Sequence, residues 1–594
     1  MFLRANRRQK DGKEHRYFSI VESRRLGSGK VAQRTVLYLG EINDSQEAAW
    51  RKTLEAFDEK EQRTRTLSLF PEDREVPADA LDAVQVKLSQ LELRRPRTFG
   101  GCWLGCEIWR DLGLQGFWDQ RLSEQRGEVD WTKVLQVLVL NRLIEPGSEF
   151  RIHRHWFDAS ALDELLGVDF EVAQKDRLYR CLDRLLPHKK ELFRFLKERW
   201  RNLFNARYEV LLYDLTSTYF EGEAEENPKA RRGYSRDGRP DCLQVVIALV
   251  ISSDGFPIAY EVMNGNTADS TTLRTFLNQI EQTYGKADRM WVMDRGIPTE
   301  KILAEMRDPA RRIYYLVGTP KARIRRTEQR WLDLPWQKVR ESVEVKLFTE
   351  DGELLVLAKS EGRRAKEQAM RRRRLVRLLR ALRAMRHSLP SRDQLMMRIG
   401  AAKSKAGRAA AFVVIELPSK DQPVTRETFR FRLDKVKFRK AELHDGHYLL
   451  RSNLISGDPA VLWERYIQLT EIEAVFRALK SDLSLRPIFH QLEHRVDAHI
   501  FVAFLAYCLT VTLQKRLQVH APGLTPRSAL EKLGTIQMLD VWIPTTDGRY
   551  LVMPRYTQPE MEQALLIEKL GLRLPAQPPP RIHLPRTGTE QPKM

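Results

Sequence analysis

The chain has 594 residues, 42% of them hydrophobic, so it is too long for a single hydrophobic core and is expected to divide into several domains. Its 101 lysines and arginines outnumber its 80 acidic residues by 21, which favours a polyanionic partner, above all nucleic acid. Five cysteines, a small and odd number, fit a reducing cytoplasm better than a disulfide framework.

No segment of the sequence is typical of a secretory signal or a membrane span. The first twelve residues, MFLRANRRQKDG, are too polar for a signal peptide. The longest apolar stretch, residues 500–513, is shorter than the roughly 18 residues of a membrane span and predicts a buried helix. Cys102 and Cys106 lack a second pair at metal-ligand spacing, so we interpret them as buried thiols. We expect a soluble, cytoplasmic protein without a membrane partner.

Residues 1–80 are expected to form a small β unit followed by a linker. Residues 17–21 and 31–39 are strand-like and are separated by a basic connection with two glycines, which predicts a β-hairpin. A hairpin lying on DNA phosphates and a solvated hairpin fit this pattern equally well. Residues 47–65 are a charged helix candidate, and residues 71–78, with two prolines, are typical of a linker.

The pattern turns helical over residues 81–205. Residues 131–143 have a broad apolar face and stop at a Glu-Pro-Gly sequence, a plain helix end. Residues 178–186 and 189–203 are two more amphipathic segments, both dotted with arginine and lysine. Short basic helices ahead of an α/β core are typical of a DNA-binding region, and a helical scaffold or dimerisation domain is the equal alternative.

Residues 206–319 are expected to form the first part of an α/β core. The elements in chain order are a strand from Glu209, strands over 243–252 and 256–262, a helix over 270–284, a strand over 289–294, a helix over 299–306 and a strand over 313–317. Three antiparallel strands followed by helix, strand, helix and strand is the order of an RNase H-like fold. The first and fourth strands are neighbours in that order, so Asp214 and Asp294 would meet.

Each of these two acids also has a simpler interpretation. Asp214 interrupts an apolar run that is typical of a strand covered on both faces, where a charged side chain is costly unless it is paired or bound to metal. Asp294 ends a similar run, residues 290–293. Taken alone, each acid is more simply a cap of the loop after its strand. Their meeting is what favours a shared acidic site.

Residues 320–456 interrupt the core and are expected to form a β-rich insertion domain with a basic helix. Strand-like pieces lie at residues 342–349, 353–358, 411–417, 428–433 and 448–452. The helical stretch 363–386 has eleven lysines and arginines and one acid, Glu367. Such a run is commonly a solvated helix face, but this excess of one sign favours contact with a DNA backbone. The expected contacts include Arg371, Arg372, Arg373 and Arg374.

Residues 457–573 are expected to complete the core with helices. A helix over 458–480 begins at an Asp-Pro pair and places five residues on one face. These residues are Tyr466, Leu469, Glu473, Arg477 and Lys480. The arrangement is either a surface ladder of ion pairs or a carboxylate facing a phosphate held by its neighbours. The proline-rich residues 574–594 are expected to be a disordered tail.

Taken in order, the blocks around Asp214, Asp294 and Glu473 resemble the DDE transposases of bacterial insertion sequences. The likeness is to the branch with a β-rich insertion before the last acid and a Tyr-x2-Arg-x3-Glu-x6-Lys signature. That signature stands here as Tyr466, Leu469, Glu473 and Lys480, with leucine at the family's arginine position. Arg477, one turn after Glu473, is a candidate to replace that arginine in part.

The resemblance implies an RNase H-like catalytic core, a divalent metal and cut-and-paste movement of a DNA element. Three carboxylates without histidine or cysteine also suit Mg²⁺ or Mn²⁺ on their own chemistry. In this hypothesis Asp214 bridges two ions, and Asp294 and Glu473 each hold one, for in-line phosphoryl transfer. A stand-alone metal-dependent nuclease and a catalytically idle DNA-binding protein are the alternatives.

The remaining expectations concern DNA and partners. Tyr466 and Lys480 would hold the strand by its phosphates, and Arg295 would do the same or form a structural salt bridge. Trp331 and Trp336 would stack on a flipped base or fill a small β core. The implied partners are double-stranded DNA, as the terminal inverted repeats and the target, and a second copy of the chain. The implied setting is the bacterial cytoplasm, associated with the nucleoid.

Overall fold

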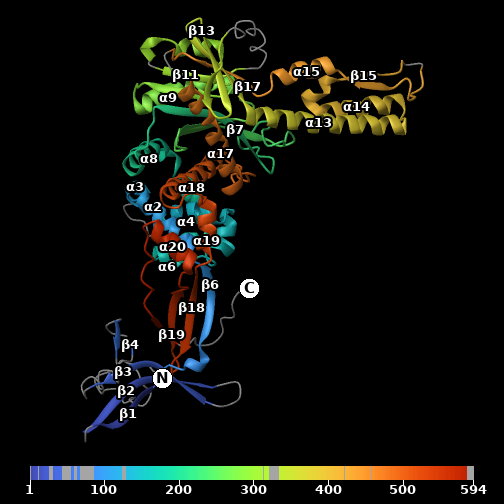
Figure 1. Ribbon diagram of the computed structural model, residues 1–594. Helices are drawn as coiled ribbons and strands as arrows, with labels where there is room; N and C mark the ends of the chain where they lie inside the picture. The colour runs from blue at the N-terminus through green and yellow to red at the C-terminus, as the bar shows by residue number, and fades with distance from the viewer. Residues whose placement is uncertain are drawn as a thin grey trace. The chain divides into compact units, whose positions relative to one another are not determined.

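The computed structural model describes residues 2–10, 13–25, 31–42, 55–58, 63–66, 86–122, 129–311, 313–319, 334–419, 422–455 and 458–584 (Figure 1). The chain divides into two compact units. We call residues 109–147 and 178–515 the sheet unit, because they contain the largest sheet. We call residues 1–108, 148–177 and 516–594 the terminal unit, because they contain both chain ends.

Five strands form the centre of the sheet unit. They are β7 (Val210–Tyr219), β8 (Gln244–Ser252), β9 (Pro257–Asn264), β10 (Arg289–Met293) and β11 (Ile313–Gly318). Their order in the sheet is β9-β8-β7-β10-β11. The pairs β7–β8 and β8–β9 are antiparallel, while β10 is parallel to both β7 and β11. This mixed sheet has the strand order expected of an RNase H-like core.

Helices cover both faces of this sheet. Tyr213 and Leu215 of β7 belong to a buried cluster with α9 (Leu273–Tyr284) and α10 (Glu300–Met306). Every residue of β8 is buried, as a strand covered on both faces requires. On the opposite face the ring of Tyr260 in β9 stacks on Phe504, with 4.0 Å between ring centres.

Phe504 belongs to α18 (Glu493–His520), the one helix in the described residues that is long and apolar enough to cross a membrane. Within its most apolar window, 89% of the residues are buried inside the protein. Thr512 of this helix accepts a hydrogen bond of 3.0 Å from the indole Nε1 of Trp200 in α8 (Lys189–Phe204). The apolar run at 500–513 is therefore part of a core helix, as predicted.

The segment expected to be a β-rich insertion lengthens the same sheet. Its strands are β12 (Gln337–Arg340), β13 (Val343–Glu350), β14 (Glu353–Ser360) and β17 (His447–Ser452). They continue the sheet beyond β11, because β17 pairs antiparallel with both β11 and β14. The buried Arg451 of β17 binds Glu353 of β14 at 2.7 Å and Glu300 of α10 at 2.6 Å. These bonds join the added strands to the core.

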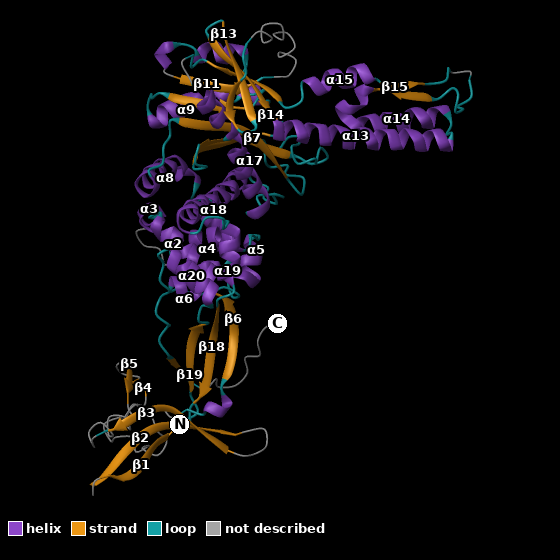
Figure 2. Ribbon diagram, in the orientation of Figure 1, coloured by secondary structure: helices purple, strands orange, loops and turns teal. Residues whose placement is uncertain are grey.

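The middle of the same segment forms a helical arm, shown at the right of the sheet in Figure 2. Its elements are α13 (Glu361–Ser388), α14 (Arg392–Ala406), β15 (Val413–Glu416), β16 (Arg430–Leu433) and α15 (Lys435–Leu443). The arm has its own small core, in which Leu378 and Leu382 of α13 meet Leu395 of α14 and Phe429.

The helical region before the core is only partly as expected. The sheet unit contains α3 (Leu114–Leu122), α4 (Trp131–Ile144) and α8, which confirms the helices predicted over 131–143 and 189–203. The helix predicted over 178–186 is α7 (Lys175–Leu182), shifted towards the N-terminus. Asp130 is the N-cap of α4, and its carboxylate accepts a hydrogen bond from the Lys133 backbone.

The terminal unit begins with a sheet of β1 (Phe2–Lys10), β2 (Lys13–Arg25) and β3 (Val31–Glu41). Strands β2 and β3 pair antiparallel, and the connection between them lies outside the described residues. The helix predicted over 47–65 is wrong where the chain is described, because β4 (Glu55–Asp58) pairs with β5 (Arg63–Thr66). Two β-branched threonines alternate with arginine in β5, a period of two that suits a strand.

A second sheet of the terminal unit joins segments from the two ends of the sequence. It has the order β20 (Arg581–His583), β19 (Tyr550–Tyr556), β18 (Gln537–Pro544) and β6 (Glu92–Thr98). Strand β6 corrects the expectation of helix throughout 81–205. Its arginine and proline residues form no apolar stripe, and β18 supplies the backbone partner. Arg97 is fully buried between Asp163 and Asp540.

Strand β20 also corrects the prediction of a disordered tail, as far as the chain is described. Proline has no backbone N–H, but its carbonyl still accepts hydrogen bonds. The carbonyl oxygen of Pro575 accepts from the Tyr556 hydroxyl, and that of Pro578 accepts from the Arg555 guanidinium, both at 2.5 Å. Residues 585–594 lie outside the described part.

Five further helices were not predicted individually. They are α2 (Gly100–Asp111), α5 (Glu149–Arg151), α6 (Leu162–Leu166), α19 (Pro526–Gly534) and α20 (Met561–Lys569). Cys102 and Cys106 lie in α2 and are buried thiols, as interpreted from the sequence.

Candidate active site

The first two acids are brought together by strand register. Tyr213 of β7 is the partner of Met293, the last residue of β10. Asp214 and Asp294 each follow one member of this pair, on parallel strands that run about 4.8 Å apart. Side chains alternate along a strand, so Asp214 points away from the cluster that holds Tyr213 and Leu215. It faces the side of the sheet that α17 (Leu469–Arg477) covers.

The third acid, Glu473, comes from α17. The helix predicted over 458–480 consists of α16 (Pro459–Ile467), α17 and a π-helical turn, Ala478–Asp482. Asp458 begins it as expected, because its carboxylate accepts a 2.8 Å bond from the Ala460 backbone. Asp214, Asp294 and Glu473 line one cavity of about 260 Å³.

Negative charge is concentrated in this cavity. Within the described residues none of the three acids has an ion-pair partner, and the only hydrogen bond to them is from the Leu215 backbone to Asp214 Oδ1, at 2.8 Å. Burial, and then the charge of Asp294, raises the pKa of Asp214 to about 7. A cation in the cavity would stabilise the charged form of all three.

The donor set fits a hard divalent cation. The three side chains supply carboxylate oxygens from three separate segments, and no thiolate lines the cavity. Oxygen donors of this kind suit Mg²⁺ or Mn²⁺. His447 also lines the cavity, but its Nδ1 lies 3.2 Å from the backbone oxygen of Asp445, which gives that nitrogen a partner inside the protein.

Tyr466 lines the same cavity and is closely packed there. Its ring contacts those of Tyr448 and Trp463, with centres 6.1 and 6.3 Å away. A Cβ atom added at Gly318, the last residue of β11, would lie 2.5 Å from the Tyr466 hydroxyl. Burial, and then the charge of Asp294, raises the pKa of Tyr466, so its hydroxyl stays protonated and able to donate.

Of the other three residues on the predicted helix face, only one lines the cavity. Leu469 lines the cavity, whereas Arg477 is exposed and does not line it. Lys480 is turned to Asp237, with 2.7 Å between Nζ and Oδ1. Arg486 binds the same oxygen, and only 3% of the Asp237 side chain is exposed. Burial lowers the pKa of Lys480, and the bond to Asp237 opposes that shift.

Two arginines line the cavity. Arg295 is exposed, and it has no acidic partner in the part of the chain that the structure describes. Arg363 was missed by the sequence reasoning, although it is the first base of the run 363–386. Its guanidinium lies 3.7 Å from the centre of the Tyr448 ring. Tyr448, Thr319 and Thr470 also line the cavity and left no signal in the sequence.

Trp336 and the four arginines at 371–374 do not line the cavity. Trp331 lies outside the described residues. Trp336 packs against a small cluster of Leu355, Leu357 and Leu449 on the added strands, and the Lys346 ammonium lies 4.9 Å from the centre of its ring. Arg371 is ion-paired with Asp445, and Arg372, Arg373 and Arg374 are exposed on α13.

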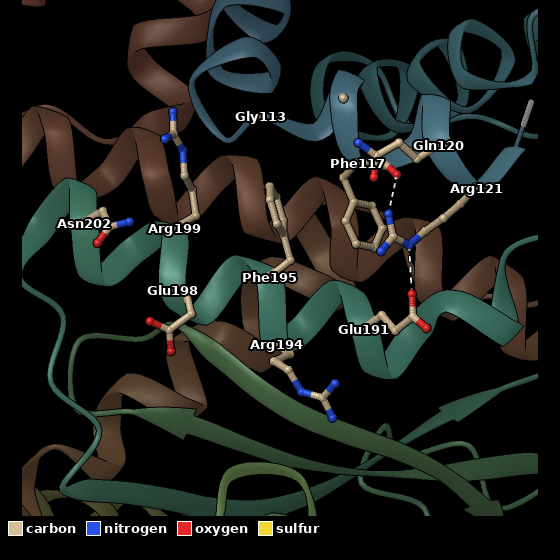
Figure 3. A pocket seen from close by; sticks show the side chains of 11 residues that line it. Gly113, Phe117, Gln120, Arg121, Glu191, Arg194, Phe195, Glu198, Arg199 and Asn202 are labelled. Atoms are coloured by element: carbon tan, nitrogen blue, oxygen red, sulfur yellow. Dashed lines mark hydrogen bonds and ion pairs between the residues drawn. The ribbon is translucent and has the colours of Figure 1, made fainter.

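A larger hollow of about 830 Å³ lies elsewhere in the sheet unit. Figure 3 shows that α3 and α8 supply its side chains, including the facing rings of Phe117 and Phe195. Charges of both signs surround these rings, and Arg121 is paired with Glu191 at 2.8 Å. The three acids are absent from its lining, so the smaller cavity is the candidate active site.

Comparison with protein families identifies the class. The family model described as "Transposase DDE domain" matches residues 205–509, more than half of the chain. The chain therefore belongs to the DDE transposases. Residues 3–68 match the model described as "IS1634 family transposase, N-terminal domain". The protein is accordingly a DDE transposase of an insertion sequence, which confirms the resemblance drawn from the sequence.

Comparisons with individual proteins are weaker. No curated protein matches the chain. A piggyBac transposase synaptic complex with hairpin DNA matches at 8% identity and a TM-score of 0.33, over 73% of this chain and 78% of that one. A Mos1 transposase paired-end complex with left transposon end matches at 15% identity and a TM-score of 0.10, over 32% and 59%. The fold assignment rests on the strand order and not on these scores.

Proposed function

We propose that this transposase binds the ends of its insertion sequence, cleaves them and joins the freed 3′-hydroxyl to target DNA by a cut-and-paste route. One observation supports this proposal above the others. Three acids from a central strand, the end of its parallel neighbour and a distant helix line one cavity with no cationic partner in the described residues.

We infer that Asp214, Asp294 and Glu473 would together hold two Mg²⁺ or Mn²⁺ ions. When bound, such a pair activates the attacking oxygen and stabilises the leaving oxygen of an in-line phosphoryl transfer. The contribution of the chain is to hold the three carboxylates on a rigid sheet and one packed helix. The three carboxylates repel one another until cations bind between them.

The other lining groups are suited to hold a DNA strand. Arg295 is exposed at the cavity and is free to contact a phosphate oxygen. The protonated hydroxyl of Tyr466 is a hydrogen-bond donor beside Asp294. Lys480 would reach a phosphate only by exchanging Asp237 for it, and we assign it that role as part of the proposal.

The partners in this proposal are duplex DNA, first the terminal repeats and then the target, and a second copy of the chain that holds the other element end. The excess of 21 positive charges supports binding to a polyanion. The proposed setting is the bacterial cytoplasm at the nucleoid.

A strand-transfer assay with Mg²⁺ and duplexes copied from the element ends tests the proposal. Asp214→Asn, Asp294→Asn and Glu473→Gln are each expected to lower cleavage and joining by about 10³-fold, the equivalent of several kcal/mol. The matched control is Glu471→Gln, which changes an exposed acid of the same helix that does not line the cavity. Full activity in any of the three cavity variants would refute the site.

The assay also separates the alternatives. Cleavage by the wild type without joining would make the protein a stand-alone nuclease. Binding to the ends without any cleavage would make it a catalytically idle DNA-binding protein.

A further inference from the structure

Helix α13 begins at the catalytic cavity. Arg363, in its first turn, lines the cavity with the three acids and also donates to the Tyr448 hydroxyl. Its Nε binds Glu367 Oε1 at 2.9 Å, and the other oxygen of Glu367 accepts a 3.1 Å bond from the Gly446 backbone. The only acid between residues 363 and 386 is thus used to hold the start of the helix.

A second ion pair holds α13 about two turns after Arg363. Arg371 binds Asp445, a side chain that is 2% exposed. Gly446 has φ of +76°, and a Cβ there would lie 2.5 Å from the Ser360 carbonyl oxygen. This turn therefore packs closely against the base of α13. The Arg371 guanidinium is therefore engaged in an ion pair within the protein.

The two long faces of α13 differ in kind. The inner face has Leu375, Leu378, Leu382 and Met385, which belong to the core of the arm. The outer face carries Lys366, Arg373, Arg377 and Arg380, spaced seven, four and three residues apart. All four are exposed, and none has an acidic partner within the described chain.

The length of this basic face can be compared with DNA. Arg380, the last of these four residues, lies 19 residues into α13, which at 1.5 Å per residue is about 28 Å from the start of the helix at the cavity. Duplex DNA rises 3.4 Å per base pair along each strand, so about 8 base pairs span the same distance. Figure 1 shows the helix leaving the sheet as a long rod with α14 along its outer half.

We propose that the outer face of α13 contacts the phosphate backbone of the duplex being cleaved, out to about 8 base pairs from the phosphate in the cavity. This inference rests on the proposed function, because that function places the reacting phosphate at the three acids. In this arrangement α13 lies along the duplex from the cavity outward and fixes the direction in which the duplex leaves the cavity.

Hydroxyl-radical footprinting of the full-length protein tests this inference. The probe is a duplex copied from the inverted repeat beside the gene, with native sequence on both sides of the cleavage point, in a buffer with chelator. Backbone protection is expected to continue on one side of that point for about 8 base pairs. Arg373 lies 12 residues into the helix, or about 18 Å, so Arg373→Gln/Arg377→Gln/Arg380→Gln should lose protection beyond about 5 base pairs.

The salt dependence of binding gives a second readout. Each lost phosphate contact lowers the slope of log K against log salt by about 0.9, so the triple variant should bind with a slope shallower by about 2.7. The matched control is Lys435→Gln/Lys437→Gln/Lys440→Gln, which removes the same charge from exposed positions on α15. The control should keep the full footprint.

Two results would overturn the inference. One is wild-type protection that ends within about 5 base pairs on both sides of the cleavage point. The other is equal loss in the α13 variant and the α15 control. Footprinting needs no catalysis, so failure here is distinct from failure of the proposed function. If the protein joins DNA but does not protect the backbone beyond about 5 base pairs, only the proposed α13 contact is refuted. If it protects the backbone there but does not cleave DNA in the assay with Mg²⁺, only the proposed transposition chemistry is refuted.

Discussion

Asp214 lies beside Asp294 because of the register between β7 and β10. The sequence predicted that it would meet Asp294, because the strand order makes β7 and β10 neighbours. The pairing of Tyr213 with Met293 has that result. The sequence did not predict how Asp214 is surrounded. Its high pKa follows from burial and from the Asp294 charge, and both depend on the packed fold.

Gly318 sets the position of Tyr466. We expect Gly318→Ala to lower cleavage about tenfold, or about 1.4 kcal/mol, because the new Cβ would lie 2.5 Å from the tyrosine hydroxyl. The Tyr466 ring also contacts the rings of Tyr448 and Trp463, so a shift of the ring would disturb those contacts. Single-turnover cleavage of an element-end duplex measures the effect.

A double-mutant cycle separates this contact from a general effect on the sheet. Tyr466→Phe removes the hydroxyl that would clash, so Gly318→Ala should cost less in that background. A coupling energy of about 0.5 to 3 kcal/mol is expected for residues in contact. Simple addition of the two losses would show that Gly318 does not act through Tyr466.

Asp237 is a positioning residue for Lys480. We expect Asp237→Asn to tighten binding to element ends several-fold at low salt, because a carboxylate that competes with phosphate is removed. The same change should lower the single-turnover cleavage rate about tenfold, since Lys480 loses its fixed place. Binding isotherms and cleavage rates on one duplex measure the two effects.

Asp241→Asn is the control for that experiment. Asp241 lies in the same loop, is 63% exposed and pairs with Arg239 rather than with Lys480. It should leave both quantities nearly unchanged. If Asp237→Asn weakened binding and cleavage by the same factor, a purely structural role would be indicated.

At the scale of elements, the main surprise is where the inserted strands go. The sequence predicted most of them as strands, but a period of two does not say which edge a strand will join. The free edge of β11 accepts β17, and β14 and β13 follow. An open edge has unpaired backbone groups that need partners, so the insertion completes the core sheet.

The anchor of α13 can be tested at this scale. Arg371→Ala should destabilise the arm by about 3 kcal/mol, because it leaves the buried Asp445 carboxylate without its cation. Amide hydrogen exchange in α13 and α14 measures local opening, which a global melt of a chain with two units would blur. Arg372→Ala, an exposed neighbour, should change exchange by no more than about 0.5 kcal/mol. Equal exchange in the two variants would contradict the anchor.

Two element predictions failed for a shared reason. Charge at residues 47–65 and proline after residue 573 favour helix and disorder locally, yet β4, β5 and β20 are strands. Each is extended because another segment supplies hydrogen-bond partners, β5 for β4 and β19 for β20. Local propensity was overridden by pairing, which a single sequence does not display.

At the scale of the whole molecule, DNA binding and DNA cleavage are expected to depend on different features. Removal of divalent metal with a chelator should abolish cleavage, because the three acids would then repel both one another and phosphate. Binding to duplex DNA should persist, since it depends on the excess of 21 positive charges, and should weaken steeply with added salt. Gel-shift and cleavage assays on the same duplex measure both. Loss of binding in chelator would show that metal is needed for more than the chemical step.

The sequence by itself determined the order of the core elements along the chain and the basic character of α13, because these follow from periodicity and composition along one segment. The choice of Asp214, Asp294 and Glu473 as candidates also depended on the resemblance to DDE transposases. Only the tertiary structure decided that the inserted strands lengthen the core sheet, that Lys480 is held by Asp237 and that Arg363 reaches the cavity. These features join residues far apart in the chain, where no local pattern records the contact.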